Sequence, residues 1–227
     1  MLQGRPGPGS WSNRPVRITT LVENRPSPDD PQLVAEWGLS QCVEVNDRRL
    51  LFDMGASDAF ARNAARLGID INAIDAAILS HHHYDHGGGL RRFLELNDHA
   101  PVYLGATPAG DPTVRLLGFV RKYIGLDKSL LATHAHRLRV VQERTEVLPG
   151  VFVLPHIGGH HPRPSGNKAL VLRKGKALVP DDFRHEVVVA LGRAGEAGGF
   201  EKGGDLGGGQ LGAQDGVHPP GAYPHRR

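Results

Sequence analysis

Four side chains that commonly bind metal ions lie within six residues of this sequence. His81, His83, Asp85 and His86 belong to the segment 80–89, which follows an apolar run and ends in three glycines. Imidazole nitrogen and carboxylate oxygen suit zinc. Because His81 and His83 are two residues apart, an extended loop directs both rings at one point, while Asp85 and His86 can turn toward a second point. The spacing predicts two metal ions that share one loop.

Such a loop would support hydrolysis. Bound zinc lowers the pKa of water to about 7, which gives hydroxide that can attack an ester, amide or phosphoryl centre. We expect His81 and His83 to hold the first ion, and Asp85 and His86 the second. Asp85 and Asp53 are the predicted catalytic carboxylates, because Asp53 ends an apolar strand and can orient a histidine N–H. His82 is expected to point away.

The surrounding pattern predicts strands and helices that place this loop at a strand end. A helix should begin at the capping Ser57 and stop at Gly68, and another should follow Gly87–Gly89. The cap-like pair Asp111-Pro112 predicts a third helix that ends at Gly125. Strands are expected at 16–22, 39–45, 49–52, 74–79, 101–104, 145–147, 151–153, 169–172 and 186–191.

Composition narrows the class of protein. A chain of 227 residues fits one folded domain, and its net charge of +3 comes from scattered Lys and Arg, so we expect a small-molecule substrate and no nucleic-acid partner. No run approaches the ~18 apolar residues of a membrane span, so no membrane partner is expected either. The single cysteine, Cys42, rules out an intrachain disulfide and fits a reducing, cytoplasmic location.

The histidine loop also carries a family resemblance. The spacing from His81 to His86, with Asp53-Met54-Gly55 upstream, resembles the H-x-H-x-D-H signature of the metallo-β-lactamase superfamily. The resemblance implies an α/β (α+β) fold, a four-layer αββα sandwich. It also implies two zinc ions per chain, with iron or manganese as alternatives.

Further segments are similar to one branch of that superfamily, labelled dihydropterin ribofuranosyl-aminobenzene phosphate synthase-like. The similarity covers roughly residues 16–190 and implies a fold and a metal site more firmly than a reaction. The segments that carry it are 18–24, 36–40, 51–55, 79–81, 123–126 and 181–183.

The two ends of the chain depart from this pattern. We expect a disordered extension over 1–14, the metallo-β-lactamase-like domain over 15–191, and a Gly-rich, disordered tail over 192–227. The resemblance implies two more metal-binding histidines near the end, and the tail has neither segment. Our hypothesis is a shifted reading frame near 191–199, which would leave the fold incomplete at its C-terminal end.

Other histidines are candidate substitutes for the missing ligands. His156, His160, His161 and His185 follow late strands, and we interpret them as exposed or substrate-lining rather than ligating. Asp181 and Asp182 are expected to fix a turn. Three functions stay open: zinc-dependent hydrolysis; condensation of a pterin phosphate or iron-dependent sulfur oxidation on the same site; and an inactive metal-binding remnant.

Overall fold

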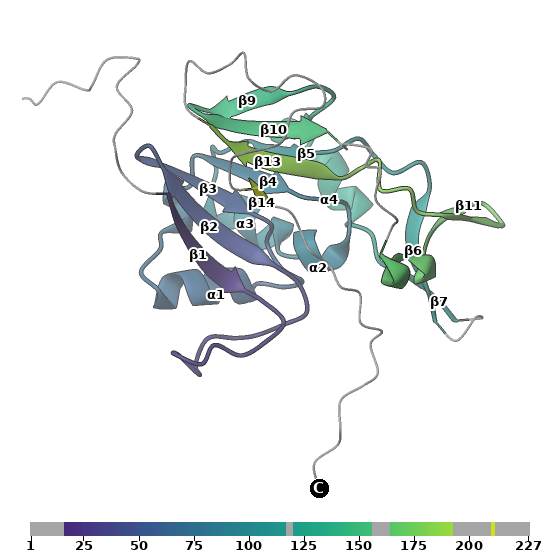
Figure 1. The fold of residues 1–227 in the computed structure, drawn as a ribbon, viewed down its shortest axis with the longest axis horizontal. Helices are drawn as coiled ribbons and strands as arrows, with labels where there is room; N and C mark the ends of the chain where they lie inside the picture. The colour runs from purple at the N-terminus through teal and green to yellow at the C-terminus, as the bar shows by residue number, and fades with distance from the viewer. Residues whose placement is uncertain (1–15, 117–119, 156–163, 193–209, 212–227) are drawn as a thin grey trace, which may run out of the picture.

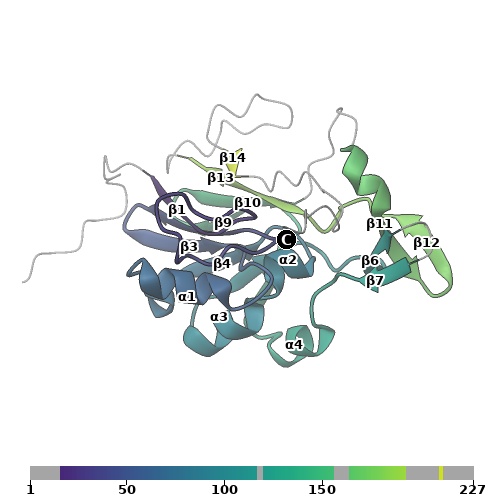
Figure 2. The same cartoon turned by 90° about the horizontal axis from the view of Figure 1, so that it is seen from below.

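The computed structural model describes residues 16–116, 120–155, 164–192 and 210–211 (Figure 1). Two sheets face one another, and a third sheet lies to one side of them in both views (Figures 1 and 2). The histidine loop lies at one end of the central strands. It leads directly into α2 (Tyr84–Gly87).

The first sheet has six strands in the order β1-β2-β3-β4-β5-β8. β1, β2 and β3 are antiparallel, whereas β3, β4, β5 and β8 run parallel. Because parallel strands end at the same edge, the residues that follow β3 and β4 meet there. The strands are β1 (Arg17–Val22), β2 (Ser40–Val45), β3 (Arg48–Phe52), β4 (Ala76–Leu79), β5 (Val102–Leu104) and β8 (Leu138–Val140).

The other two sheets are antiparallel and have four strands each. The second sheet has the order β14-β13-β10-β9, and the third has the order β12-β11-β6-β7. The second comprises β9 (Thr145–Leu148), β10 (Val151–Pro155), β13 (Val187–Leu191) and β14 (Gln210–Leu211). The third comprises β6 (Asp111–Leu116), β7 (Val120–Tyr123), β11 (Leu170–Lys174) and β12 (Ala177–Pro180).

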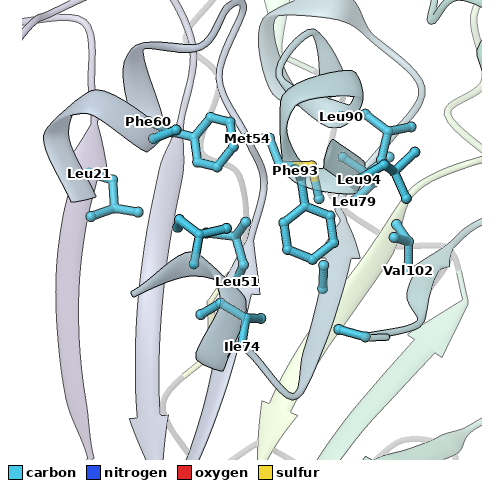
Figure 3. Packing of buried hydrophobic residues seen from close by; sticks show 14 of the residues in the cluster. Leu21, Leu51, Met54, Phe60, Ile74, Leu79, Leu90, Phe93, Leu94 and Val102 are labelled. Atoms are coloured by element: carbon cyan, nitrogen blue, oxygen red, sulfur yellow. The ribbon is translucent and has the colours of Figure 1, made fainter. Parts of the chain in front are cut away.

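Helices cover the outer face of the six-stranded sheet (Figure 2). Their apolar side chains meet the sheet in one buried cluster that includes Phe60, Phe93, Met54 and Leu51 (Figure 3). The helical elements besides α2 are α1 (Ala59–Arg66), η1 (Ile71–Ala73), α3 (Leu90–Leu96), α4 (Lys128–Thr133) and η2 (Ser165–Ala169).

A second core lies between the first two sheets. Leu50, Phe52 and Ile78 of the first sheet pack in one buried cluster with Val153 and Val189 of the second. The described layers are therefore helix, sheet and sheet, and the described helices leave the outer face of the second sheet uncovered. The predicted α/β class is confirmed, while the fourth layer of the predicted αββα sandwich is not among the described residues.

The first predicted helix forms, but its N-cap is Asp58 and not the predicted Ser57. Ser57 Oγ lies just before α1 and accepts the N–H of Ala59 at 3.1 Å. Gly68 follows its end with φ +71°, a left-handed conformation that glycine adopts without strain. The predicted strands also form, with ends shifted by up to two residues.

The predicted helix over 111–125 is wrong. This stretch forms β6 and β7, and Val114 pairs with Leu170 of β11 on one side and Lys122 of β7 on the other. The cap-like Asp111-Pro112 signal is local, and pairing with β11, about 60 residues away in sequence, overrides it. The next helix, α4, begins after Asp127, whose side chain accepts the N–H groups of Ser129 and Leu130.

The chain ends lie mostly outside the described residues, so the predicted boundaries at 14 and 191 stay predictions. Within the predicted tail, Gln210 and Leu211 pair with Ala190 and Val189 of β13. In the described part of the chain, no helix is long and apolar enough to cross a membrane.

Candidate metal centre

The site is built on Asp53, the first residue after β3. Its backbone has φ +57°, a conformation that is uncommon outside glycine, and its carbonyl accepts the Ser40 hydroxyl at 2.8 Å. Its amide donates to the carbonyl of Ile78 in β4 at 2.9 Å. A strained residue at a strand end is a recurrent mark of functional sites. Here the turn carries the fully buried carboxylate to the end of β4.

The Asp53 carboxylate accepts three hydrogen bonds. Ser80 donates its amide to Oδ1 and its hydroxyl to Oδ2, both at 2.7 Å, and His86 Nδ1 lies 2.6 Å from Oδ2. A carboxylate cannot donate, so His86 carries its proton on Nδ1. Its Nε2 therefore keeps a lone pair. A histidine held in this way by a carboxylate is the usual form of a metal ligand.

Ser80 determines which nitrogen of His81 carries the proton. Because the Ser80 hydroxyl proton points at Asp53, its oxygen accepts from His81 Nδ1, which lies 2.9 Å away. His81 is therefore also protonated on Nδ1 and keeps a lone pair on Nε2. Burial, followed by the neighbouring histidines, holds the pKa of His81 well below its usual range. The ring is neutral at pH 7, as metal binding requires.

His81, Asp85 and His86 form what we call the first ligand group. One nitrogen or oxygen of each lies within 4.8 Å of those of the other two. His86 Nε2 is 4.0 Å from Asp85 Oδ2. Both histidines are buried, and the Asp85 side chain is 17% exposed. Two imidazoles and one carboxylate fit a zinc ion in number and in chemistry, with room for a further ligand.

His83, Asp181 and His185 form the second ligand group, whose three side chains are all buried. His185 Nε2 lies 3.2 Å from both oxygens of Asp181. His83 Nε2 is 3.6 Å from Asp181 Oδ2 and has no hydrogen-bond partner. Burial opposes ionisation of Asp181, but the adjacent imidazoles of His185 and His83 outweigh this effect and hold the pKa of Asp181 well below the usual range.

The His185 ring is protonated differently from the histidines of the first group. Its Nδ1 accepts the backbone N–H of His82 at 3.3 Å, so its proton is on Nε2 and faces Asp181. The Val187 amide, which donates to the Ser80 carbonyl at 2.7 Å, fixes this segment beside the histidine loop. A metal on Nε2 of His185 would have to displace that proton.

The structure brings the predicted site residues together but groups them differently from the expectation. His81 and His83 are neighbours, with ring centroids 4.6 Å apart, yet His81 joins Asp85 and His86 while His83 joins the Asp181 segment. His82 points away, as expected, with Nε2 3.0 Å from the Gly105 carbonyl. The candidates His156, His160 and His161 lie outside the described residues.

Sequence reasoning missed two participants. Ser80 was seen only as part of the motif, although a hydroxyl directly before the first histidine was a usable signal. Asp181 does fix a turn, as predicted, because its Oδ1 accepts the Phe183 amide at 2.9 Å. It also faces His83 and His185, which the sequence could not reveal without the docking of β13.

Comparison with known proteins establishes the family. Residues 37–168, more than half of the chain, match the model of the metallo-beta-lactamase superfamily. The chain belongs to that superfamily. A crystal structure of a metal-dependent hydrolase of the beta-lactamase superfamily is similar, with TM-score 0.59 and 27% identity over 78% of this chain and 61% of that chain.

Two curated relatives come from Methanocaldococcus jannaschii. One is a 7,8-dihydropterin-6-methyl-4-(beta-D-ribofuranosyl)-aminobenzene-5'-phosphate synthase, 29% identical over 153 residues, which cover 63% of this chain and 51% of that protein. The other is an uncharacterized protein, 39% identical over 78 residues, or 34% of this chain and 29% of that protein. The chain thus spans about half the length of the first relative.

Proposed function

We propose that the protein is a metal-dependent hydrolase that uses zinc and acts on an ester or phosphoryl bond of a small molecule. The observation that carries this proposal is the first ligand group. His81 and His86 are both protonated on Nδ1 and both keep an Nε2 lone pair, and His86 Nε2 lies 4.0 Å from Asp85 Oδ2 in the same cluster. Three protein ligands with a further open position are typical of catalytic zinc.

Zinc held there would supply a water of lowered pKa and would stabilise negative charge on the attacked oxygen. The protein's own residues prepare the site for it. Asp53 and Ser80 keep two imidazoles neutral and oriented, and burial of both rings excludes competing solvent ligands. Asp85 contributes the only negative charge of the group and is its most exposed member, with a side chain that is 17% exposed.

A second ion would use the second ligand group. The buried His83 Nε2, which lies 3.6 Å from Asp181 Oδ2, and the ionised Asp181 support this role. The proton on His185 Nε2 opposes it, because an ion must displace that proton first. We therefore propose two zinc ions of unequal affinity, with the tighter one in the first ligand group.

Condensation with a ring-bearing phosphate is the second candidate function. The name of the 29% identical relative supports it, as do the aromatic residues beside the site. The Phe183 ring lies 5.7 Å from the rings of both His83 and His185, and the Trp37 side chain near Asp85 is exposed. Aromatic side chains of this kind can stack against a planar ring.

The test begins with metal content. Protein purified without a histidine tag is dialysed against metal-free buffer, analysed by elemental mass spectrometry, and assayed on a panel of carboxylic and phosphate esters. We expect about one tightly held zinc per chain. We expect turnover that is lost in His86→Ala and kept in the exposed control His99→Ala.

The other outcomes are distinct. Retained iron in place of zinc would replace hydrolysis by oxidative chemistry at the same residues. Ring-phosphate condensation without ester turnover would favour the second candidate. No retained metal, or turnover that survives His86→Ala, would overturn the proposal.

A further inference from the structure

Trp37 contacts the first ligand group from a distant part of the sequence. Its indole Nε1 donates to Asp85 Oδ2 at 3.1 Å, across 48 residues of chain. Trp37 is 40% exposed and belongs to neither hydrophobic core. Its hydrogen bond to Asp85 is a directional contact that core packing does not explain.

Both neighbours of Trp37 are fixed. The Glu36 carboxylate accepts the amides of Ala56 and Ser57 at 2.9 and 3.0 Å, and the Ser57 hydroxyl at 2.6 Å. These hydrogen bonds anchor Glu36 to the residues just before α1. Such an anchor lowers the entropic cost of holding the indole in one place.

Gly38 completes the attachment on the other side. Its amide donates to Asn24 Oδ1 at 2.9 Å, and its backbone has φ +137°, which side-chain-bearing residues rarely adopt. A Cβ at this position would collide with the backbone carbonyl of Asp85. The segment 36–38 therefore packs directly on the residue whose side chain Trp37 contacts.

Asp85 is the member of the first ligand group that most needs such support. His81 and His86 are held from behind by Ser80 and Asp53, and both are buried. Asp85 has a side chain that is 17% exposed and lies outside the Asp53 network. The indole N–H fixes the rotamer of the carboxylate through Oδ2, and this oxygen, which lies 4.0 Å from His86 Nε2, has a second lone pair for a metal.

We infer that Trp37 is a positioning residue that holds the Asp85 carboxylate in place for metal binding by the first ligand group. The inference rests on the proposed function, in which that group binds zinc. Trp37 would orient Asp85 as Asp53 orients His86 and as Ser80 orients His81. Loss of such an outer partner typically lowers metal affinity about 10- to 100-fold.

The test compares Trp37→Phe with two controls. Phenylalanine keeps an aromatic ring but has no N–H. Tyr84→Phe alters an exposed ring at the residue next to Asp85, and Trp11→Phe removes the chain's other tryptophan. Zinc affinity is measured by competition with a chromogenic chelator, and ligand geometry by the absorption spectrum of the Co²⁺-substituted protein.

We expect Trp37→Phe to bind zinc about tenfold more weakly and to change the Co²⁺ spectrum, while both controls match the wild type. The melting temperature of metal-free Trp37→Phe should equal that of the metal-free wild type, which separates positioning from folding. Trp37→His, which restores an N–H donor, should recover part of the affinity.

Failure of the inference differs from failure of the proposed function. If the wild type binds zinc tightly and Trp37→Phe binds it equally well, the positioning role is wrong and the metal site stands. If the wild type binds no zinc, the proposed function falls and the role of Trp37 falls with it.

Discussion

The two ligand groups contain the same residue types, two histidines and one aspartate, but they differ in where their protons are. In the first group, Ser80 and Asp53 hold the Nδ1 protons of His81 and His86 from behind. In the second, the His82 amide occupies Nδ1 of His185 and leaves the proton on Nε2, facing the carboxylate. Residue type alone therefore does not establish a metal site, because the partner behind each ring sets the tautomer.

The groups also differ in how their carboxylates are satisfied. Asp85 is partly exposed and receives one indole N–H, whereas Asp181 is 1% exposed and already lies between two imidazoles. A metal entering the second group must replace hydrogen bonds that stabilise a buried charge. A metal entering the first group meets lone pairs that are already oriented. This difference predicts unequal affinities.

Removal of one ligand from each group should give the largest contrast. His86→Ala should lower the affinity for the tight zinc ion by more than the 10- to 100-fold that outer-shell losses cost, and leave no metal after dialysis. His185→Ala should keep the tight ion and lose only the weaker one. Calorimetric zinc titration of both variants, beside His99→Ala, measures this. Loss of the tight ion in His185→Ala would reverse the assignment of the two groups.

The sequence was sufficient to locate the residues of the first ligand group. It was insufficient to show that His83 belongs to the second ligand group. His81, Asp85 and His86 lie within six residues, so local spacing predicts them. The pairing of His83 with Asp181 and His185 depends on the Val187 amide bonding the Ser80 carbonyl, a contact between segments more than 100 residues apart. No local pattern encodes that distance.

The same division between local and distant signals applies to the fold. The helix from Ser57 to Gly68 has its signals at both ends, and it forms. The stretch after Asp111 also had helix signals, but its hydrogen bonds go to β11. Prediction failed where partners came from distant segments, which are also the segments that shape the second ligand group.

Acid should destabilise the metal-free protein in two separate pH windows. Burial lowers the pKa of His82, next to the first group, from its ordinary 6.5 to about 4, partly offset by its bond to Gly105. As pH falls through this range, the unfolded chain binds a proton that the folded chain does not. We expect the free energy of unfolding to decrease by roughly 3 kcal/mol between pH 6.5 and 4. His81, whose pKa is also lowered, adds to this loss.

The second group should respond only at lower pH. The pKa of Asp181 is held below its ordinary 3.8, so its stabilising contribution is complete above that value and is lost as pH falls below it. Urea unfolding with chelator present, from pH 7.5 to 3, measures both windows. His82→Gln should reduce the upper one and Asp181→Asn the lower one. If both variants had equal effects in the same pH window, the prediction of two separate windows would be wrong.

Asp53→Asn should weaken the first group more than the second. An amide nitrogen would place a donor against the donors of Ser80 or His86, so the imidazoles would lose their enforced tautomer. We expect zinc affinity at the tight site to fall about 10- to 100-fold, with the weaker site unchanged. The control Asp75→Asn changes a carboxylate that pairs with Arg48 at the surface. A similar fall at both sites would mean that Asp53 acts through general stability.

Ser80→Ala should produce the smallest and most selective change. It removes the hydroxyl that links His81 Nδ1 to Asp53, but His86 keeps its own bond to that carboxylate at 2.6 Å. The variant no longer fixes the tautomer of His81 but still fixes that of His86. We therefore expect roughly a tenfold fall in zinc affinity, at the lower end of the range for residues that hydrogen-bond to a metal ligand. Ser80→Thr keeps the hydroxyl and should restore most of the affinity. If alanine and threonine weaken binding equally, packing at this position matters, and the relay from Asp53 through Ser80 to His81 is wrong.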